Sequence, residues 1–197
     1  VDILIGTQMV TKGHDFPRVT LVGVIDADVG LDLPDFRANE RSYQLLSQVS
    51  GRAGRAALSG EVIIQTYRPS EERLLAAISH DYHRFFTYEL ALREAITYPP
   101  FGYLATIRLR GEQGEKLTQA LESLSDRLSQ CAPSVRVRGP VIAPVNMANG
   151  LQRWLIVLLC PNRKALHLEL QGIQTQLNRI RRSGIYCLID VDPYNFF

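Results

Sequence analysis

The octet QVSGRAGR, residues 48–55, places five specified residues at constant spacing. Such a pattern arises by chance in fewer than about one in a thousand chains of this length, since each residue type is used at roughly 5%. Apolar residues before the octet recur at helical spacing and predict an amphipathic helix that leads into it: Phe36, Tyr43, Leu45, Leu46 and Val49. Gly51 and Gly54 would let the backbone turn tightly, while Arg52 and Arg55 project from it.

The two arginines of the octet are suited to phosphate. A guanidinium is always charged and meets phosphate oxygens with two parallel hydrogen bonds, so it can stabilise charge that develops on a transferring γ-phosphoryl group. The structural alternative is a solvated Arg-Gly turn that caps a helix.

The octet has the form Gln-x-x-Gly-Arg-x-Gly-Arg and resembles motif VI of superfamily 2 helicases, the arginine-finger motif on the second of two RecA-like lobes. Residues 6–17, GTQMVTKGHDFP, resemble motif V of the same superfamily. Four further segments extend the resemblance over nearly the whole chain, to the primosomal helicases that restart bacterial replication forks: DAD at 26–28, PDFRA at 34–38, YPPF at 98–101 and LIDVDP at 188–193.

The resemblance implies roles for residues of both motifs. Arg55 would be the catalytic arginine finger, aided by Arg52, and Gln48 would orient the finger or sense nucleotide. Gly13 and Asp15 would bind ATP together with the two arginines. The DNA backbone would be held by polar residues of motif V, the loop after the first strand: Thr7, Gln8, Thr11 and Lys12. Such loops bind ligands in α/β folds. A polar loop with Asp15 as a helix cap is the structural alternative.

Related helicases carry more sequence ahead of the region that this chain matches. The resemblance implies an N-terminal DNA-binding region, a first RecA-like lobe and a zinc-binding insertion there. This chain lacks the Gly-x-x-x-x-Gly-Lys-Ser/Thr pattern that cradles phosphates. ATP and Mg²⁺ are therefore expected in the full-length enzyme, between the lobes, and this fragment alone should not hydrolyse ATP.

Composition is that of an ordinary globular protein, with 46% hydrophobic and 21% charged residues in 197. No apolar run reaches the roughly 18 residues of a membrane helix. We therefore expect a soluble protein that is not exported, and the resemblance implies a bacterial cytoplasmic, nucleoid-associated one. Cys131, Cys160 and Cys187 are isolated, which predicts neither a disulfide framework nor a metal site.

Charge differs between the two halves. Residues 1–98 carry a net charge of −3, and residues 99–197 carry +5. The basic residues of the second half recur in three groups: Arg108 with Arg110, Arg136 with Arg138, and Arg179 with Arg181 and Arg182. This favours a polyanion or an acidic peptide as partner, although a solvated basic face would look the same.

The segment YPPFG at 98–102 interrupts the helical pattern and predicts a boundary between two domains, 1–98 and 99–197. For the first, we predict apolar strands at 3–6, 19–25 and 62–66, and one or two helices within 70–97. This is an α/β parallel-sheet pattern, and the resemblance identifies it as part of RecA-like lobe 2. Aromatic residues of the helices are predicted to be mostly core or interface residues: Tyr82, Phe85, Phe86 and Tyr88.

The second domain has the pattern β-α-β-β-α-β, which predicts a small α+β ferredoxin-like sandwich. Its strands are expected at 103–110, 135–145, 154–160 and 186–191, and its helices at 115–131 and 163–181. Residues 146–150, with an Asn-Gly signal at their end, predict a hairpin turn that joins the two central strands. In the first strand, the alternation of side chains predicts an apolar face that contains Ile107 and a solvent-exposed face that contains Leu104, Thr106 and Arg108.

Arg163 and Lys164 open the last predicted helix, where positive charge opposes the helix dipole. The resemblance implies that this domain binds DNA at forks and single-stranded/duplex junctions. It also implies binding of the acidic C-terminal tail of single-stranded DNA-binding protein, with Arg163 as the best match and Lys164 beside it, and contacts with other primosome proteins. We expect a monomer.

The sequence thus predicts the C-terminal part of an ATP-dependent 3′-to-5′ DNA helicase that recognises stalled or branched forks and restarts replication. Two alternatives remain open. One is a helicase-derived DNA- or protein-binding module without catalytic activity. The other is a branched-DNA translocase of the RecG type, which shares motifs V and VI but is disfavoured by the YPPF and DVDP segments.

Overall fold

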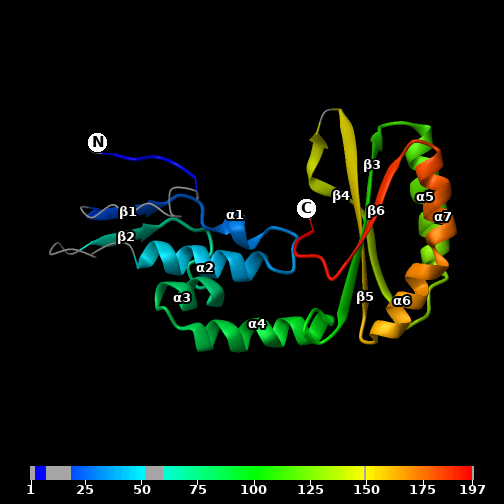
Figure 1. Cartoon of the computed structure of the whole chain (residues 1–197). Coiled ribbons are helices and arrows are strands. Elements are labelled where there is room, and N and C mark those ends of the chain that lie inside the picture. Colours follow the sequence, from blue (N-terminus) through cyan, green and yellow to red (C-terminus); the bar gives the residue numbers. More distant parts are fainter. Residues whose placement is uncertain (1–2, 8–18, 52–59, 149, 197) are drawn as a thin grey trace. The chain divides into compact units, whose positions relative to one another are not determined.

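The computed structural model of the chain describes residues 3–7, 19–51, 60–148 and 150–196 (Figure 1). The chain divides into two compact units, Val1–Ala91 and Leu92–Phe197. The division falls within helix α4 (Tyr82–Ile96), ahead of the YPPFG segment. Separate functions for residues 1–98 and 99–197 remain a prediction.

The first unit contains a parallel pair of strands, β1 (Leu21–Val24) and β2 (Glu61–Ile64), in which Leu21 lies opposite Glu61. Both strands were predicted. The strand predicted at 3–6 is wrong, because residues 3–7 form neither helix nor strand, and Ile3 and Ile5 are 79% and 89% exposed. An apolar run becomes a strand only when a neighbour pairs its backbone groups, and no described strand does so. The α/β class holds, and the RecA-like assignment stays a prediction.

Four helices accompany this pair in the described part of the first unit: α1 (Asp28–Leu31), α2 (Ala38–Ser50), α3 (Glu72–Ile78) and α4. The core contains Tyr43 of α2, Leu74 of α3 and Phe85 of α4, and the rings of Tyr43 and Phe85 stack at 4.3 Å between centroids. Of the four α4 aromatics, only Phe85 is buried. The other three are exposed, although the ring of Tyr82 also contacts that of Tyr43 at 6.0 Å between centroids. A core role is confirmed for Phe85, and an interface role for the others stays a prediction.

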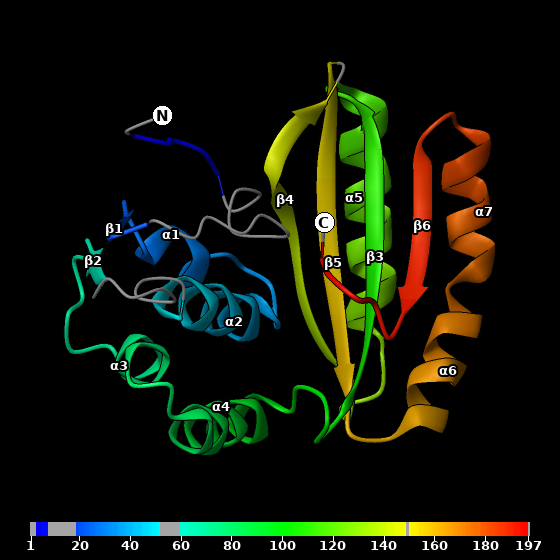
Figure 2. The same ribbon diagram turned by 60° about the vertical axis from the view of Figure 1, so that its left-hand side comes forward.

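The second unit has the predicted order of elements: β3 (Tyr103–Glu112), α5 (Glu115–Ser129), β4 (Arg136–Ala148), β5 (Leu151–Cys160), α6 (Arg163–Gly172), α7 (Gln174–Arg182) and β6 (Tyr186–Val191). The four strands form an antiparallel sheet in the order β4-β5-β3-β6 (Figure 2). This order brings the first and last strands of the unit together at the side of the sheet away from β4. It confirms the predicted antiparallel α+β sandwich.

Two details of the second unit refine the predictions. The single helix predicted at 163–181 is two helices, α6 and α7, which meet at the fully buried Ile173. Gly172 is a poor helix former, and the break lets both apolar faces follow the twisted sheet. The predicted hairpin is confirmed, since Ala148 pairs with Leu151 and Gly150 has a φ of +76°. Its turn is shorter than 146–150, and it joins the edge strand β4 to β5 and not two central strands. Asn149 lies outside the described residues.

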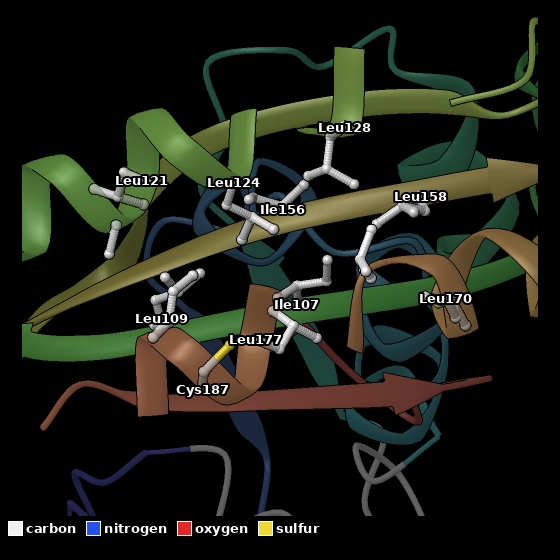
Figure 3. Packing of buried hydrophobic residues seen from close by; sticks show 14 of the residues in the cluster. Ile107, Leu109, Leu121, Leu124, Leu128, Ile156, Leu158, Leu170, Leu177 and Cys187 are labelled. Atoms are coloured by element: carbon white, nitrogen blue, oxygen red, sulfur yellow. The ribbon is translucent and has the colours of Figure 1, made fainter. Parts of the chain in front are cut away.

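One face of the sheet carries the core of the second unit (Figure 3). Leu124 of α5 and Leu177 of α7 pack onto Ile107 of β3 and Ile156 of β5, and all four are completely buried. Each such side chain stabilises the fold by about 1.5–3 kcal/mol relative to exposure. The apolar face predicted for the first strand is therefore confirmed.

The opposite face of the sheet is not uniformly wet, which corrects the prediction. Leu104 and Thr106 are 0% exposed. The C-terminal segment, residues 192–196, runs beside them. The amide of Asp192 donates to the carbonyl of Leu104 at 2.9 Å, and Nη2 of Arg108 donates to the carbonyl of Asn195 at 2.8 Å. Strand alternation could not reveal this, because these bonds join residues nearly 90 positions apart.

Candidate functional site

Helix α2 leads to the arginine octet, as predicted. Tyr43, Leu46 and Val49 are buried on one side of the helix, and Gln48 is exposed near its C-terminal end. Gly51 follows with a φ of −80°, and its amide donates to the carbonyl of Ser47 at 3.1 Å. This backbone is one that any residue adopts, so Gly51 needs no glycine-specific conformation. The tight turn expected from Gly51 and Gly54 stays a prediction, because Gly54 lies outside the described residues. The helix nevertheless fixes where the octet begins.

Most predicted catalytic, ATP-binding and DNA-binding residues lie outside the described residues. These are Gln8, Thr11, Lys12, Gly13, Asp15, Arg52 and Arg55. Thr7 is described and exposed. The roles assigned to all of them, and to Gln48, stay predictions.

The loops that follow β1 and β2 are joined by Asp28. Its Oδ2 accepts from the amide of Tyr67 at 2.8 Å, and its Oδ1 accepts from Nε of Arg68 at 3.0 Å. The hydroxyl of Thr66 lies 3.0 Å from both carboxylate oxygens. Arg68 also reaches Oδ1 of Asp32 at 2.8 Å. Because both loops lie at the carboxyl ends of parallel strands, this cluster fixes the edge where α/β folds place ligands.

Electrostatics keeps this cluster ionised. The amide of Tyr67, together with Arg68 and Thr66, holds the pKa of the Asp28 carboxyl below its ordinary value of 3.8, although burial opposes the shift. Asp28 is 5% exposed. The acidic DAD segment thus has a structural role through its last residue. Sequence reasoning missed Arg68, because nothing near Asp28 in the sequence points to a partner 40 residues away.

The entry to α2 is organised by Asp35. Its Oδ1 accepts from the amide of Arg37, and its Oδ2 accepts from Nη2 of Arg41, both at 2.8 Å. The Asp35 side chain is fully buried. Arg41 therefore bonds a residue that precedes its own helix.

Arg163 and Lys164 are exposed in the first turn of α6. The side chain of Asn162 caps this helix, since its Oδ1 accepts from the amide of Ala165 at 3.1 Å. Neither basic side chain has a partner within the described part of the chain. Both are thus available to an anion, and their role in partner binding stays a prediction.

The three basic groups of the second half do not form one patch. Arg136 and Arg138 lie on β4 and Arg110 on β3, whereas Arg179 and Arg182 lie on α7, which packs against the other face of the sheet. Arg108 and Arg181 have structural partners: Arg108 binds Asp190 and Asn195, and Arg181 donates through Nε to the carbonyl of Cys187 at 2.9 Å.

The cysteines show no sign of reactivity. All three are free, and burial raises the pKa of Cys131 and of Cys187 to about 11, so these thiols stay protonated at neutral pH. No group of three or more His, Cys, Asp or Glu side chains among the described residues is placed to hold a metal ion. Nor does any helix there have the length and apolarity to cross a bilayer.

Comparison with known proteins identifies the family. Residues 94–194 match the family described as Primosomal protein N C-terminal domain. This range covers the second unit, with its sheet and helices, almost completely. The chain therefore belongs to the primosomal protein N, or PriA, family.

Individual relatives extend the match to the first unit. Replication restart protein PriA of Bacillus subtilis is 40% identical over 195 residues, which are 98% of this chain and 24% of that protein. The proteins of the same name from Haemophilus influenzae and Rickettsia typhi are 38% and 39% identical over 97% and 100% of the chain. The chain spans about a quarter to a third of these relatives. The resemblance inferred from the motifs is confirmed.

Among solved structures, the de novo designed protein Foldit4 aligns with 47% of this chain and 97% of its own, at a TM-score of 0.39 and 12% identity. A likeness of this size supports no conclusion about fold or function.

Proposed function

We propose that this chain is the C-terminal part of an ATP-dependent 3′-to-5′ DNA helicase that recognises stalled or branched replication forks and restarts replication through primosome assembly. The observation that carries the proposal is the identity of 37–40% with proteins named Replication restart protein PriA, over nearly all of this chain. Both units fall within that match, so the helicase motifs and the C-terminal sandwich belong to one polypeptide.

In this proposal the first unit contributes to ATP turnover. Arg55, aided by Arg52, neutralises charge on the γ-phosphoryl group, while ATP and Mg²⁺ are held largely by a lobe outside this chain. Gly13 and Asp15 contact the nucleotide, and Thr7, Gln8, Thr11 and Lys12 hold the DNA backbone. Helix α2 supports the assignment, because its buried face anchors Gln48 at the start of the octet. The zinc site belongs to a segment upstream of this chain.

The decisive experiment removes the finger from the full-length protein. An arginine finger accelerates phosphoryl transfer by about 10³–10⁵-fold. Arg55→Ala should therefore nearly abolish DNA-stimulated ATPase while leaving fork affinity almost unchanged. Arg182→Ala is the matched control, since it removes one exposed positive charge from α7. Retained turnover in Arg55→Ala would refute the finger. A wild-type protein that binds forks but never turns over ATP would be a non-catalytic binding module.

The second unit is proposed to bind DNA and the acidic tail of single-stranded DNA-binding protein, with Arg163 and Lys164 as the tail contacts. Their exposure in the first turn of α6 supports this. Titrating a tail peptide against Arg163→Ala tests it, and unchanged affinity would end the idea. We further propose a monomer that works in the bacterial cytoplasm, at the nucleoid, with other primosome proteins.

A further inference from the structure

Three side chains form a row across the second unit's sheet, on the face opposite the helices. Arg110 of β3 lies opposite Arg153 of β5 and opposite Tyr186 of β6. Directly paired residues project from the same face with about 4.5–5.5 Å between Cβ atoms. The neighbours Leu109, Trp154 and Cys187 pack into the core instead, so alternation places the other three on the open face. We refer to Arg153, Arg110 and Tyr186 as the Arg-Arg-Tyr row.

The row is available for binding. Tyr186 is 58% exposed, and both arginines are half-buried. Within the residues that the structure describes, none of these three side chains has a hydrogen bond, ion pair or ring contact, whereas that of Arg108, one pair further along β3, binds Asp190 and Asn195. Like charges directly opposite each other destabilise a sheet. Two uncompensated arginines in register therefore favour an anionic ligand over a structural role.

A cavity of about 510 Å³ adjoins the row. Arg110 and Tyr186 line it, together with Lys116 at the start of α5 and residues of the turn between α7 and β6. The cavity lies where β3 continues without β6 beside it. The last residue pair between these two strands is Arg110 with Tyr186. Among the lining residues Glu112 is the only carboxylate, so the walls keep a net positive charge. The volume lies within the range of small-ligand sites.

We propose that the Arg-Arg-Tyr row binds single-stranded DNA: the ring of Tyr186 stacks on one base, and the guanidiniums of Arg110 and Arg153 bind the flanking phosphates. The inference rests on the proposed function in taking DNA as the ligand, and adds the strand state and the contact residues. An aromatic ring beside basic groups is the combination that single strands require, because unpaired bases expose their π faces. Duplex DNA hides those faces within its own stack.

The chemistry has a general precedent on sheets. RNA recognition motifs stack two or three bases on aromatic side chains of a four-stranded sheet. Here the aromatic residue lies on the edge strand β6 and the central strands carry arginines. The row therefore suits one stacked base and adjacent phosphates, and it is expected to contribute affinity with little sequence preference.

The stacking interaction is tested with the 197-residue chain and a fluorescent oligothymidylate, by anisotropy. Base–aromatic stacking is worth about 5- to 150-fold in affinity by alanine substitution. Tyr186→Ala should weaken binding by that factor, and Tyr186→Phe should bind like the wild type because the ring remains. With an abasic strand, which keeps the phosphates and lacks the bases, Tyr186→Ala and wild type should bind equally. Tyr67→Ala removes a more exposed tyrosine, at 84%, as the control.

The binding of phosphates is tested by salt dependence. For a single strand, removing one protein–phosphate interaction lowers the slope of log K against log salt by about 0.7. Arg110→Gln and Arg153→Gln should each show this decrease. Arg84→Gln, which removes the same charge from an exposed site on α4, should keep the wild-type slope. Circular dichroism of each variant must match the wild type, so that altered binding reports the row and not unfolding.

Several outcomes would overturn the inference. These are unchanged affinity in Tyr186→Ala, an equal loss on the abasic strand, or a wild-type chain that binds no oligonucleotide. A polyglutamate peptide that displaces the strand at equal concentration would instead make the row an acidic-peptide site. None of these results bears on the Arg55→Ala ATPase experiment, which concerns the first unit. A failed row is thereby separable from a failed helicase assignment.

Discussion

Arg108 ties the C-terminal segment to the sheet, and replacing it tests this role. Its Nη2 donates to the carbonyl of Asn195 at 2.8 Å and to Oδ2 of Asp190 at 3.2 Å. Arg108→Met keeps most of the side-chain length and removes both interactions. Because the segment is also held by the bond from the Asp192 amide to the Leu104 carbonyl, we expect local opening of residues 192–196 and an intact second unit.

The size of the effect follows from these two interactions. A hydrogen bond from a charged donor contributes about 1.5–3 kcal/mol. The ion pair with Asp190 adds little, since that side chain is 39% exposed and such pairs are worth about 0–1 kcal/mol. A free-energy change of about 1.36 kcal/mol changes an equilibrium constant tenfold. Removing the hydrogen bond to Asn195 alone should therefore raise the equilibrium constant for opening of the segment by roughly 10- to 150-fold.

Amide hydrogen exchange measures that opening directly. The protection of the Asp192 amide should fall by about 10- to 150-fold in Arg108→Met, while core amides such as that of Ile107 keep their protection. Arg110→Met is the matched control, because Arg110 points from the same face of β3 and has no partner among the described residues. Asp192 protection that stays within about threefold of wild type would refute the tethering role of Arg108.

Two further predictions concern stability. Asp28→Asn should lower the urea midpoint of the first unit at neutral pH, unlike Asp26→Asn at an exposed site. Because the folded-state pKa of Asp28 is below 3.8, its contribution is complete above that pH and is lost as pH falls through the folded value, so wild type and Asp28→Asn should converge in acid. Gly102→Ala should lower Tm by about 4 °C or more, because the new Cβ would lie 2.5 Å from the Thr97 carbonyl and overpacking costs about 1–3 kcal/mol. Gly23→Ala, with nothing within 4 Å of the new Cβ, should not lower Tm; equal Tm values for both glycine variants would contradict the clash.

Much of the second unit follows from local pattern. The alternation of β3, the apolar spacing of α5 and the Asn-Gly signal of the hairpin each specify one element. Together their order allows few topologies other than the antiparallel sandwich. The arginine octet likewise indicated the family before any fold was known. These features depend on residues near each other in the sequence.

Other features were decided by partners distant in the sequence. Residues 3–5 are as apolar as a buried strand, yet they form no strand, since pairing is a property of two segments. Leu104 and Thr106 lie on the face predicted to be wet, yet they are completely buried.

Sequence alone therefore determined the order and type of most elements, because the spacing of apolar residues shows which side of each element is buried. It also determined the membership of the family, through the motifs. The tertiary structure decided which groups meet: Asp28 with Arg68, Arg108 with Asn195, and Arg110 with both Arg153 and Tyr186. The sequence does not show which residue a charged side chain will contact. Only strand register and tertiary packing set the distance between the two groups.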